Sequence, residues 1–402
     1  MGLPADQHDH ARHRHDTHRP ADRGKAPARL RQFRGGANRM TARRAAAGFL
    51  LTLALAMPAA AETLRVATYN VELSRRGPGI LLRDISRGGD PKIAAVIEVI
   101  ATVQPDVLAL QGIDWDLDGL ALAALQQALT RAGAVYPHTF SALPNTGLPS
   151  GHDMDGDGRL DEPEDMQGYG EFTGADGMAI LSRLPIDRER TRDFSAVLWR
   201  DLPGAQLPTH PDGSAFPTAE AQAAQRLSSV AHWAVPVRLP SGQTLTVLTF
   251  HATPPVFDGP EDRNGRRNAD EILFWRAYLD GAFGPPPDGR FIIAGDANLD
   301  PHDSDGRREA ITTLLNDPRL TDARPASPGA ETAPTQGHTG PDALDTVDWD
   351  GIGRLRVDYV LPSADLRVTG AGVYWPAPDQ PGHDAATTAS RHRLVWVDID
   401  AP

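Results

Sequence analysis

The chain has 402 residues, of which 40% are hydrophobic and 23% charged, a composition typical of globular domains. It contains no cysteine, which excludes a disulfide framework and a lipoprotein attachment site. The formal net charge is −13, and without residues 1–61 it is −20, from 29 basic and 49 acidic side chains. A field of that sign repels polyanions, so bulk nucleic acid is disfavoured as a partner.

The first 61 residues have the pattern of a targeting segment. Residues 1–39 are rich in His, Arg and Pro, and we interpret them as a disordered extension or an over-extended start before Met40. Arg43 and Arg44 precede an apolar run at 45–57, and the run ends in a small-x-small pattern at Ala61. This predicts a signal peptide over 40–61 and a secreted or periplasmic protein. The run is shorter than the roughly 20 residues of a membrane span, and its basic flank disfavours a buried core helix.

The next segments alternate between strand and helix patterns. Thr63–Val71 alternates and is β-rich, 90–102 has helical spacing, Val107–Leu110 is a short apolar run, and 120–132 is an Ala/Leu helix with Asp118 placed to cap it. This order is typical of a layered α/β domain.

The remainder of the chain continues the alternation after a long segment without periodicity at 139–172. We expect strands at 177–181, 230–239, 243–251, 290–295, 354–361, 371–374 and 394–399, helices at 268–279 and 309–315, and a loop at 321–350. No repeat or linker interrupts the pattern, so we predict one domain over 62–402.

Several polar residues stand at or near the ends of the predicted strands. They are Asn70, Asp114, His251, Asp296, Asn298, Asp358 and His392. Any one of them alone is more often a turn residue or a helix cap than a functional group. Together they belong to short motifs that recur in a fixed order.

Those motifs are Thr68-Tyr69-Asn70, Leu110-Gln111, Gly295-Asp296-Ala297-Asn298, Arg356-Val357-Asp358-Tyr359-Val360 and Ser390-Arg391-His392. In order and type they resemble the endonuclease/exonuclease/phosphatase superfamily, which includes DNase I-like nucleases, sphingomyelinases and inositol phosphatases. The resemblance runs from about residue 64 to 399, and the segment 253–268 resembles a secreted bacterial branch. It implies a four-layer α/β sandwich, with two mixed β-sheets packed face to face and helices outside.

The resemblance also implies divalent-metal-dependent hydrolysis of phosphate esters, with Mg²⁺ or Mn²⁺ at the active site. Asp296 would orient or activate the water, and Asn298 would position the phosphate. Asn70 would contribute to the metal and phosphate site. His392, oriented by Asp358, would stabilise charge on the phosphoryl group, and His251 would act as general acid or phosphate donor.

Two positions depart from the family pattern. Gly112 stands where the family has the Glu that is its principal metal ligand, and Arg391 stands where the family has an Asp. Arg391 opposes metal binding and favours an anion, so we list it as a substrate-binding candidate. Asp114 lies on the same strand face as Gly112, about 6.6–7 Å along, and could replace the missing ligand. The alternative is that Asp114 begins an acidic loop leading into a helix.

A second metal motif is independent of the fold. Counted from Asp153, the segment 153–164 has acids at positions 1, 3, 5, 9 and 12 and Gly158 at position 6, as calcium loops do. The predicted ligands are Asp153, Asp155, Asp157, Arg159 through its carbonyl, Asp161 and Glu164. No helix pair flanks the segment, which favours a structural Ca²⁺ loop over a sensor. The alternative is an acidic solvated loop.

A basic segment follows His251, and Arg263, Arg266 and Arg267 could bind phosphate there or pair with neighbouring acids.

Taken together, the sequence predicts a secreted or periplasmic metal-dependent phosphoesterase with an altered metal site, acting on a small-molecule or lipid-borne phosphate ester. The alternative function is a catalytically silent member of the family that serves as a calcium-stabilised binding protein. The sequence leaves the oligomeric state open.

Overall fold

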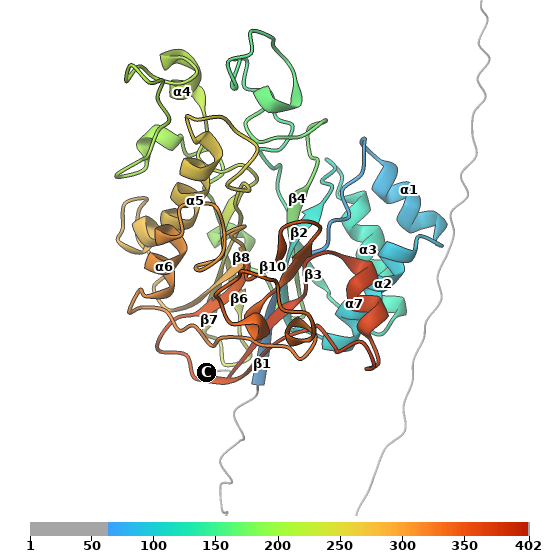
Figure 1. Ribbon diagram of the computed structural model, residues 1–402. Coiled ribbons are helices and arrows are strands. Elements are labelled where there is room, and N and C mark those ends of the chain that lie inside the picture. The colour runs from blue at the N-terminus through green and yellow to red at the C-terminus, as the bar shows by residue number, and fades with distance from the viewer. Residues whose placement is uncertain (1–62, 401–402) are drawn as a thin grey trace, which may run out of the picture. The chain divides into compact units, whose positions relative to one another are not determined.

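Two β-sheets packed face to face, with helices on their outer sides, make up the part of the chain that the structure describes (Figure 1). This computed structural model describes residues 63–400. The predicted extension and signal peptide lie outside the described residues. The α/β sandwich expected from the sequence is confirmed.

The first sheet has six strands in the order β12-β13-β1-β2-β4-β3. Strands β1 and β2 are parallel and the other pairs are antiparallel. The bounds are β1 Thr63–Asn70, β2 Val107–Ile113, β3 His138–Phe140, β4 Gly177–Ser182, β12 Val368–Val373 and β13 Val395–Asp400.

The second sheet has five strands in the order β11-β8-β7-β6-β5, and only β7 and β8 are parallel. A separate two-stranded hairpin joins β9 and β10. The bounds are β5 Arg192–Asp193, β6 His232–Arg238, β7 Thr244–His251, β8 Arg290–Asp296, β9 Val347–Trp349, β10 Gly353–Leu355 and β11 Asp358–Pro362.

Helices cover the outer face of each sheet. In Figure 1, α1, α2, α3 and α7 gather beside the first sheet, and α5 and α6 lie beside the second. Their bounds are α1 Ile80–Arg87, α2 Pro91–Val103, α3 Leu120–Arg131, α4 Ala219–Ala224, α5 Arg263–Leu279, α6 Glu309–Leu315 and α7 His383–Ala389. None of the helices within residues 63–400 is long and apolar enough to cross a membrane.

The alternation of side chains along the central strands divides the core into layers. In β1, Val66 joins the cluster between the two sheets, whereas Ala67 and Tyr69 pack against the helices. In β8, Ile292 and Ala294 face the other sheet in the same way. Since side chains alternate with a period of two, polar residues two positions further along stay on the inner face, at the end of the sandwich.

Most predicted elements lie within a few residues of the observed ones, and the differences have local causes. Helix α3 is capped by Asp116, whose carboxylate accepts hydrogen bonds from the amides of Leu120 and Ala121, rather than by Asp118. Helix α5 begins at Arg263, five residues before the prediction. The strand predicted at 354–361 is two strands, β10 and β11, in different sheets. The sequence analysis missed α1, α4 and α7.

Candidate active site

Polar side chains from both sheets meet at one end of the inter-sheet core. Strand register brings them together, because His251 and Asp358 each stand directly beside Asp296 in the second sheet. Asn70 ends β1 of the first sheet, and its Nδ2 donates a hydrogen bond of 2.9 Å to Asp296 Oδ2. Asn70, His251 and Asp296 follow the apolar inner-face residues of their strands, and Asp358 precedes those of the antiparallel strand β11.

Asp296 is the centre of this group and is fully buried. Its Oδ1 accepts a hydrogen bond of 2.8 Å from the backbone N–H of Asn298. Its Oδ2 lies 3.4 Å from His251 Nε2 and 3.7 Å from His392 Nδ1. The side chain of Asn298 donates to the carbonyl of Ala252, so it fixes the loop after β7 as well as the Asp296 carboxylate.

His392 and Asp358 form a buried pair. His392 Nδ1 lies 3.0 Å from Asp358 Oδ2, and the hydroxyl of Thr346 donates to the same oxygen at 2.8 Å. Burial alone would lower the pKa of His392, but the carboxylates of Asp358 and Asp296 outweigh it and raise this pKa to about 9. Burial raises the pKa of Asp358 to about 6, although His392 acts in the opposite direction. The imidazole therefore carries a proton near neutral pH.

Asp176, just before β4, is a member of the site that the sequence analysis missed. Its carboxylate receives no hydrogen bond from residues 63–400, and burial raises its pKa, which the nearby His251 partly offsets. The Nδ1 atom of His251 is also buried without a partner among the described residues. Asp176 has a φ of 50° and lies in a loop. That loop contains no recognisable sequence motif, so nothing in the sequence indicated its place near the site.

Gly112 is a glycine for a steric reason. Its φ is +74°, and a Cβ atom there would lie 2.4 Å from Asn70 Oδ1 and 2.7 Å from the backbone nitrogen of Glu72. Residues with side chains rarely adopt that φ, and real Cβ contacts are not that short. The position where the family has its metal-binding Glu has no room for any side chain in this structure.

Arg391 is held by Glu72. The Nε atom of Arg391 donates to Glu72 Oε1 at 2.6 Å, and its backbone N–H donates to Oε2 at 2.9 Å. Lys92 Nζ lies 3.4 Å from Oε2. Burial would raise the pKa of Glu72, but the hydrogen bonds from Arg391 outweigh it and lower this pKa to about 2. Glu72 was not among the residues that the sequence analysis considered.

Asp114 does not replace the missing ligand. Its carboxylate accepts hydrogen bonds from the Ser74 hydroxyl at 2.5 Å, the Arg75 amide at 2.9 Å and the Asp176 amide at 3.3 Å. These bonds fasten the loop after β1 to the segment before β4. Asp114 therefore supports the site and does not join the Asp296 group.

The predicted phosphate role of the basic segment also needs correction. Arg267 is 6% exposed, and its guanidinium donates to the carbonyls of Gln167, Arg226, Leu227 and Ser228. Arg263 donates to the carbonyl of Met154 and Arg266 to that of Glu261. In the described part of the chain these three guanidinium groups donate to backbone carbonyls and form no ion pair with the neighbouring acids, so they hold the surrounding backbone in place.

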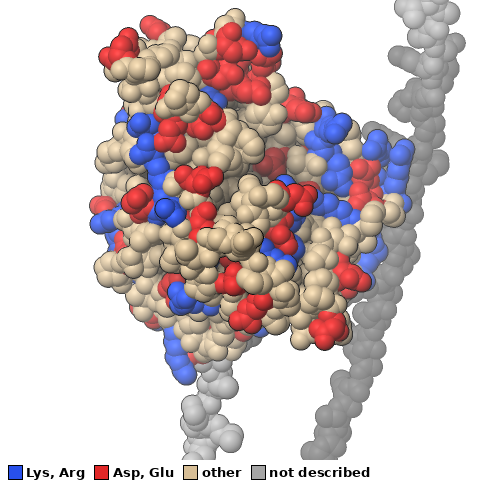
Figure 2. Space-filling model, viewed as in Figure 1, with Lys and Arg blue, Asp and Glu red and all other residues tan. Residues whose placement is uncertain are grey.

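The acidic segment 153–165 lies apart from this site. Carboxylate oxygens of Asp153, Asp155 and Asp165 lie within 4.8 Å of one another, a group able to hold a cation. Glu164, the predicted twelfth-position ligand, is outside this group, as are Asp157 and Asp161, and Asp165 takes part instead. Figure 2 shows acidic side chains gathered at the top of the molecule, over this segment.

The residues at the centre of the site fit a divalent metal. Asp296 and Asp358 offer carboxylate oxygens within 4.8 Å of each other, whereas the His392 ring is hydrogen-bonded to Asp358. Carboxylate and amide oxygens are the ligands that Mg²⁺ and Mn²⁺ prefer. Among the described residues, Asp296 and Asn70 supply such oxygens. Gly112 supplies none.

Several solved structures are similar to this chain in fold. A structure described as endonuclease/exonuclease/phosphatase from Beutenbergia cavernae is 18% identical, with a TM-score of 0.50 over 84% of this chain and 72% of that one. A family protein from Leptotrichia buccalis is 16% identical, with a TM-score of 0.46 over 84% and 99%. Sphingomyelinase C from Streptomyces griseocarneus is 20% identical, with a TM-score of 0.44 over 84% and 99%.

No curated protein matches the sequence. The sequence pattern of the Endonuclease/Exonuclease/phosphatase family matches residues 67–392, which span the site from β1 to His392. The chain belongs to the endonuclease/exonuclease/phosphatase family.

Proposed function

We propose that the protein hydrolyses a phosphate ester with the help of a divalent metal, at the site centred on Asp296. One observation carries the proposal: Asn70, His251, Asp358 and His392 converge on the carboxylate of Asp296 in a chain of this family. Hydrolysis of such an ester needs a positioned water, a group to take its proton, and positive charge near the phosphoryl oxygens.

The residues divide these tasks by their charge. His392 is protonated near neutral pH because Asp358 and Asp296 flank it, so it donates a hydrogen bond and positive charge to a phosphoryl oxygen. Asp296 accepts a proton from the attacking water or orients that water. His251 stands beside Asp296 Oδ2 and protonates the leaving oxygen. Asp296 and Asn70 would hold the metal, which would supply Lewis acidity when bound.

We further propose that Asp176 contributes the carboxylate that Gly112 cannot. Asp176 directly precedes Gly177, which pairs with Ile113 across strands β4 and β2, so the acid comes from the neighbouring strand. Its carboxylate has no other described partner and lies close enough to His251 and Asp296 to be influenced by their charges. The carboxylate would then come from the start of β4 instead of from β2. The site would keep its acidic group, in a position different from that in the family pattern.

The edge of the site favours a substrate with an accessible anionic group. Arg391 is 63% exposed at its side chain, and Lys92 is 33% exposed, so both cations border the site next to His392. The acidic net charge argues against long nucleic acids. We therefore propose a small-molecule or lipid-borne phosphate ester as the substrate class.

The test is a panel of phosphomonoesters and phosphodiesters assayed with Mg²⁺, Mn²⁺ and chelator. We expect metal-dependent turnover that falls by about 10²–10⁴-fold in Asp296→Ala and in His392→Ala, with both variants still folded at the assay temperature. Arg131→Gln, in the last turn of α3 and outside the site, serves as the control. Turnover that is unchanged in Asp296→Ala would contradict the proposed active site. Inactivity of the wild type on every ester would favour the alternative function, a calcium-stabilised binding protein.

We also propose that the segment 153–165 binds Ca²⁺ through Asp153, Asp155 and Asp165. The support is the group of carboxylates in that segment and the calcium-loop spacing of the sequence. Arg263 contacts the carbonyl of Met154 within the segment, which connects it to α5. The ion would order a long connection that contains little regular structure.

Export remains a proposal from the sequence. Arg43, Arg44 and the small-x-small pattern ending at Ala61 support cleavage after Ala61 and a secreted or periplasmic location. N-terminal sequencing of the exported protein should begin within one or two residues of Glu62. A mature protein that retains Phe49 would contradict the proposal.

A further inference from the structure

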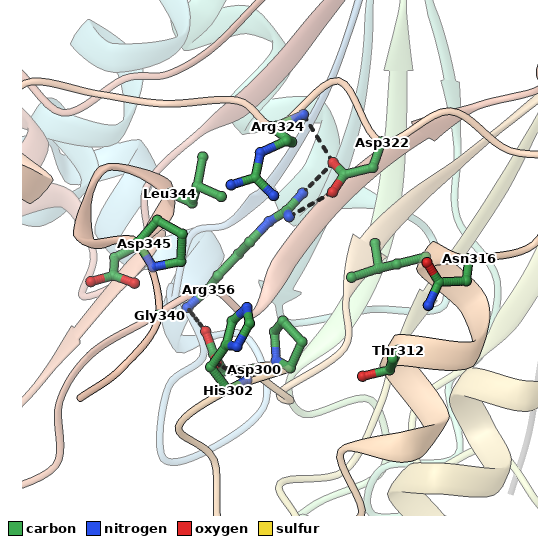
Figure 3. A pocket seen from close by; sticks show the side chains of 13 residues that line it. Asp300, His302, Thr312, Asn316, Asp322, Arg324, Gly340, Leu344, Asp345 and Arg356 are labelled. Carbon is green, nitrogen blue, oxygen red and sulfur yellow. Dashed lines mark hydrogen bonds and ion pairs between the residues drawn. The ribbon is translucent and has the colours of Figure 1, made fainter. Parts of the chain in front are cut away.

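A second cavity, of about 390 Å³, lies away from the Asp296 group (Figure 3). Helix α6, the segment after β8 and the loop before β9 surround it. Its polar lining consists chiefly of Asp300, His302, Asn316, Arg324, Asp345 and Arg356. None of the residues proposed for catalysis lines it, so it is a separate site.

Most charges at this cavity already have partners within the protein. The carboxylate of Asp300 accepts hydrogen bonds from the amides of His302 at 2.6 Å, Asp303 at 2.8 Å and Arg356 at 2.8 Å. The guanidinium of Arg356 binds both oxygens of Asp322, at 2.8 and 2.6 Å. Figure 3 shows this pair and the Asp300 contact as dashed lines. These groups need no ligand.

Two charges of opposite sign remain. Asp345 is 8% exposed, and no donor among residues 63–400 binds its carboxylate. Burial raises its pKa to about 7, and the carboxylates of Asp300 and Asp342 add to that effect. Arg324 is exposed at the cavity, and its guanidinium forms no ion pair with a carboxylate of the described residues. A buried carboxylate without a partner is costly to keep ionised.

We propose that this cavity binds a small zwitterion, with its ammonium group on Asp345 and its anionic group on Arg324. A zwitterion can form ion pairs with both Asp345 and Arg324, whereas a singly charged ligand can pair with only one of the two. The volume lies within the usual range for small-molecule sites. Leu315 and Leu344, which also line the cavity, suit a short aliphatic chain between the two groups.

The cavity is connected to the catalytic pair through one residue. Thr346 follows Asp345, and its hydroxyl accepts hydrogen bonds from the amides of Val357 and Asp358, both at 3.0 Å. Its own proton is thereby directed to Asp358 Oδ2, 2.8 Å away. A ligand held by Asp345 fixes the backbone that orients this hydroxyl. Ligand binding should therefore raise turnover, an expectation that rests on the proposed function.

The binding test uses titration calorimetry with defined probes on the whole protein. 4-Aminobutyrate and phosphoethanolamine are the zwitterions, and they distinguish a carboxylate from a phosphate as the anionic group. Butyrate, butylamine and inorganic phosphate are the singly charged controls. We expect at least one zwitterion to bind at least tenfold more tightly than every singly charged probe. No binding by either zwitterion at about 10 mM would overturn the proposal, as would equal binding by a singly charged probe.

Variants assign the contacts. Asp345→Asn and Arg324→Gln should each weaken zwitterion binding at least tenfold, whereas Arg131→Gln, in the last turn of α3, should not change it. Asparagine is isosteric with aspartate, and melting curves check that both variants fold. Unchanged affinity in folded Asp345→Asn overturns the site.

A turnover assay with and without the bound zwitterion tests the connection to catalysis. Binding without any change in turnover overturns the connection and leaves the cavity assignment intact. Because calorimetry needs no substrate, a failure of the proposed hydrolysis would not affect the binding result.

Discussion

Glu72 holds Arg391 at 2.6 Å, and the backbone of the same Glu72 occupies the space that a side chain at position 112 would need. The two departures from the family pattern are therefore linked through one residue. A glycine at 112 lets the chain at Glu72 come close, and an arginine at 391 neutralises the Glu72 carboxylate. The structure explains them as one rearrangement of the site.

Restoring the family Glu at position 112 should damage the protein rather than activate it. Gly112→Ala already places a Cβ atom 2.4 Å from Asn70 Oδ1 in a backbone with a φ of +74°. We expect a loss of about 2 kcal/mol or more in the free energy of unfolding, measured by denaturant titration. Gly119→Ala is the matched control, because its φ is +65° with no atom within 4 Å. Equal losses in the two variants would show that crowding at Asn70 is unimportant.

The stability of the protein should depend on His392 at alkaline pH. The folded-state pKa of His392 is raised to about 9 from an ordinary value of 6.5. Its stabilising effect is therefore complete below pH 6.5 and is lost as the pH rises to about 9. The slope approaches at most about 1.4 kcal/mol per pH unit. Unfolding titrations between pH 6.5 and 9.5 should show this loss in the wild type and a flatter dependence in His392→Gln.

Calcium should raise the melting temperature through the segment 153–165. A ligand at a hundredfold excess over its Kd adds about 2.7 kcal/mol to the free energy of unfolding. Asp165→Asn should abolish the increase, because Asp165 belongs to the carboxylate group, whereas Glu164→Gln should retain it. The measurement is thermal unfolding with Ca²⁺ and with chelator. A response lost in Glu164→Gln and kept in Asp165→Asn would restore the ligand set predicted from the sequence.

Without a ligand, Asp345→Asn should stabilise the protein above neutral pH. The folded-state pKa of Asp345 is raised to about 7, so the free energy of unfolding falls as the pH rises from about 4 to 7. Asparagine cannot ionise, so the variant avoids this decrease in the free energy of unfolding. We expect the decrease to be on the order of 1 kcal/mol after allowance for screening by solvent. The variant should therefore melt at a higher temperature than the wild type at pH 8, and at a similar temperature at pH 4. A lower melting temperature at pH 8 would contradict this account.

The fold was predictable because both of its signals are local. The alternation of β1, the apolar run of β8 and the helical spacing of α2 can be read from neighbouring residues. Asn70 and Asp296, which end β1 and β8, and Asp358 and His392 were found because they belong to the family motifs. Asp176 and Glu72 were missed because each belongs to an irregular loop and acquires its role from partners far along the chain. The roles of Asp114 and Arg267 were misjudged for the same reason, since burial and backbone partners cannot be read from a motif.

Asn70 and Asp296 belong to different sheets, yet their side chains are joined at 2.9 Å. The site is therefore formed by residues of both sheets, and neither sheet alone contains all the residues that catalysis requires. A slip of β1 or β8 by a single residue in its pairing register would turn Asn70 or Asp296 from the inner face toward the helices. Loss of catalysis and loss of the inter-sheet core should therefore occur as one event, so that no folded but inactive intermediate accumulates on heating.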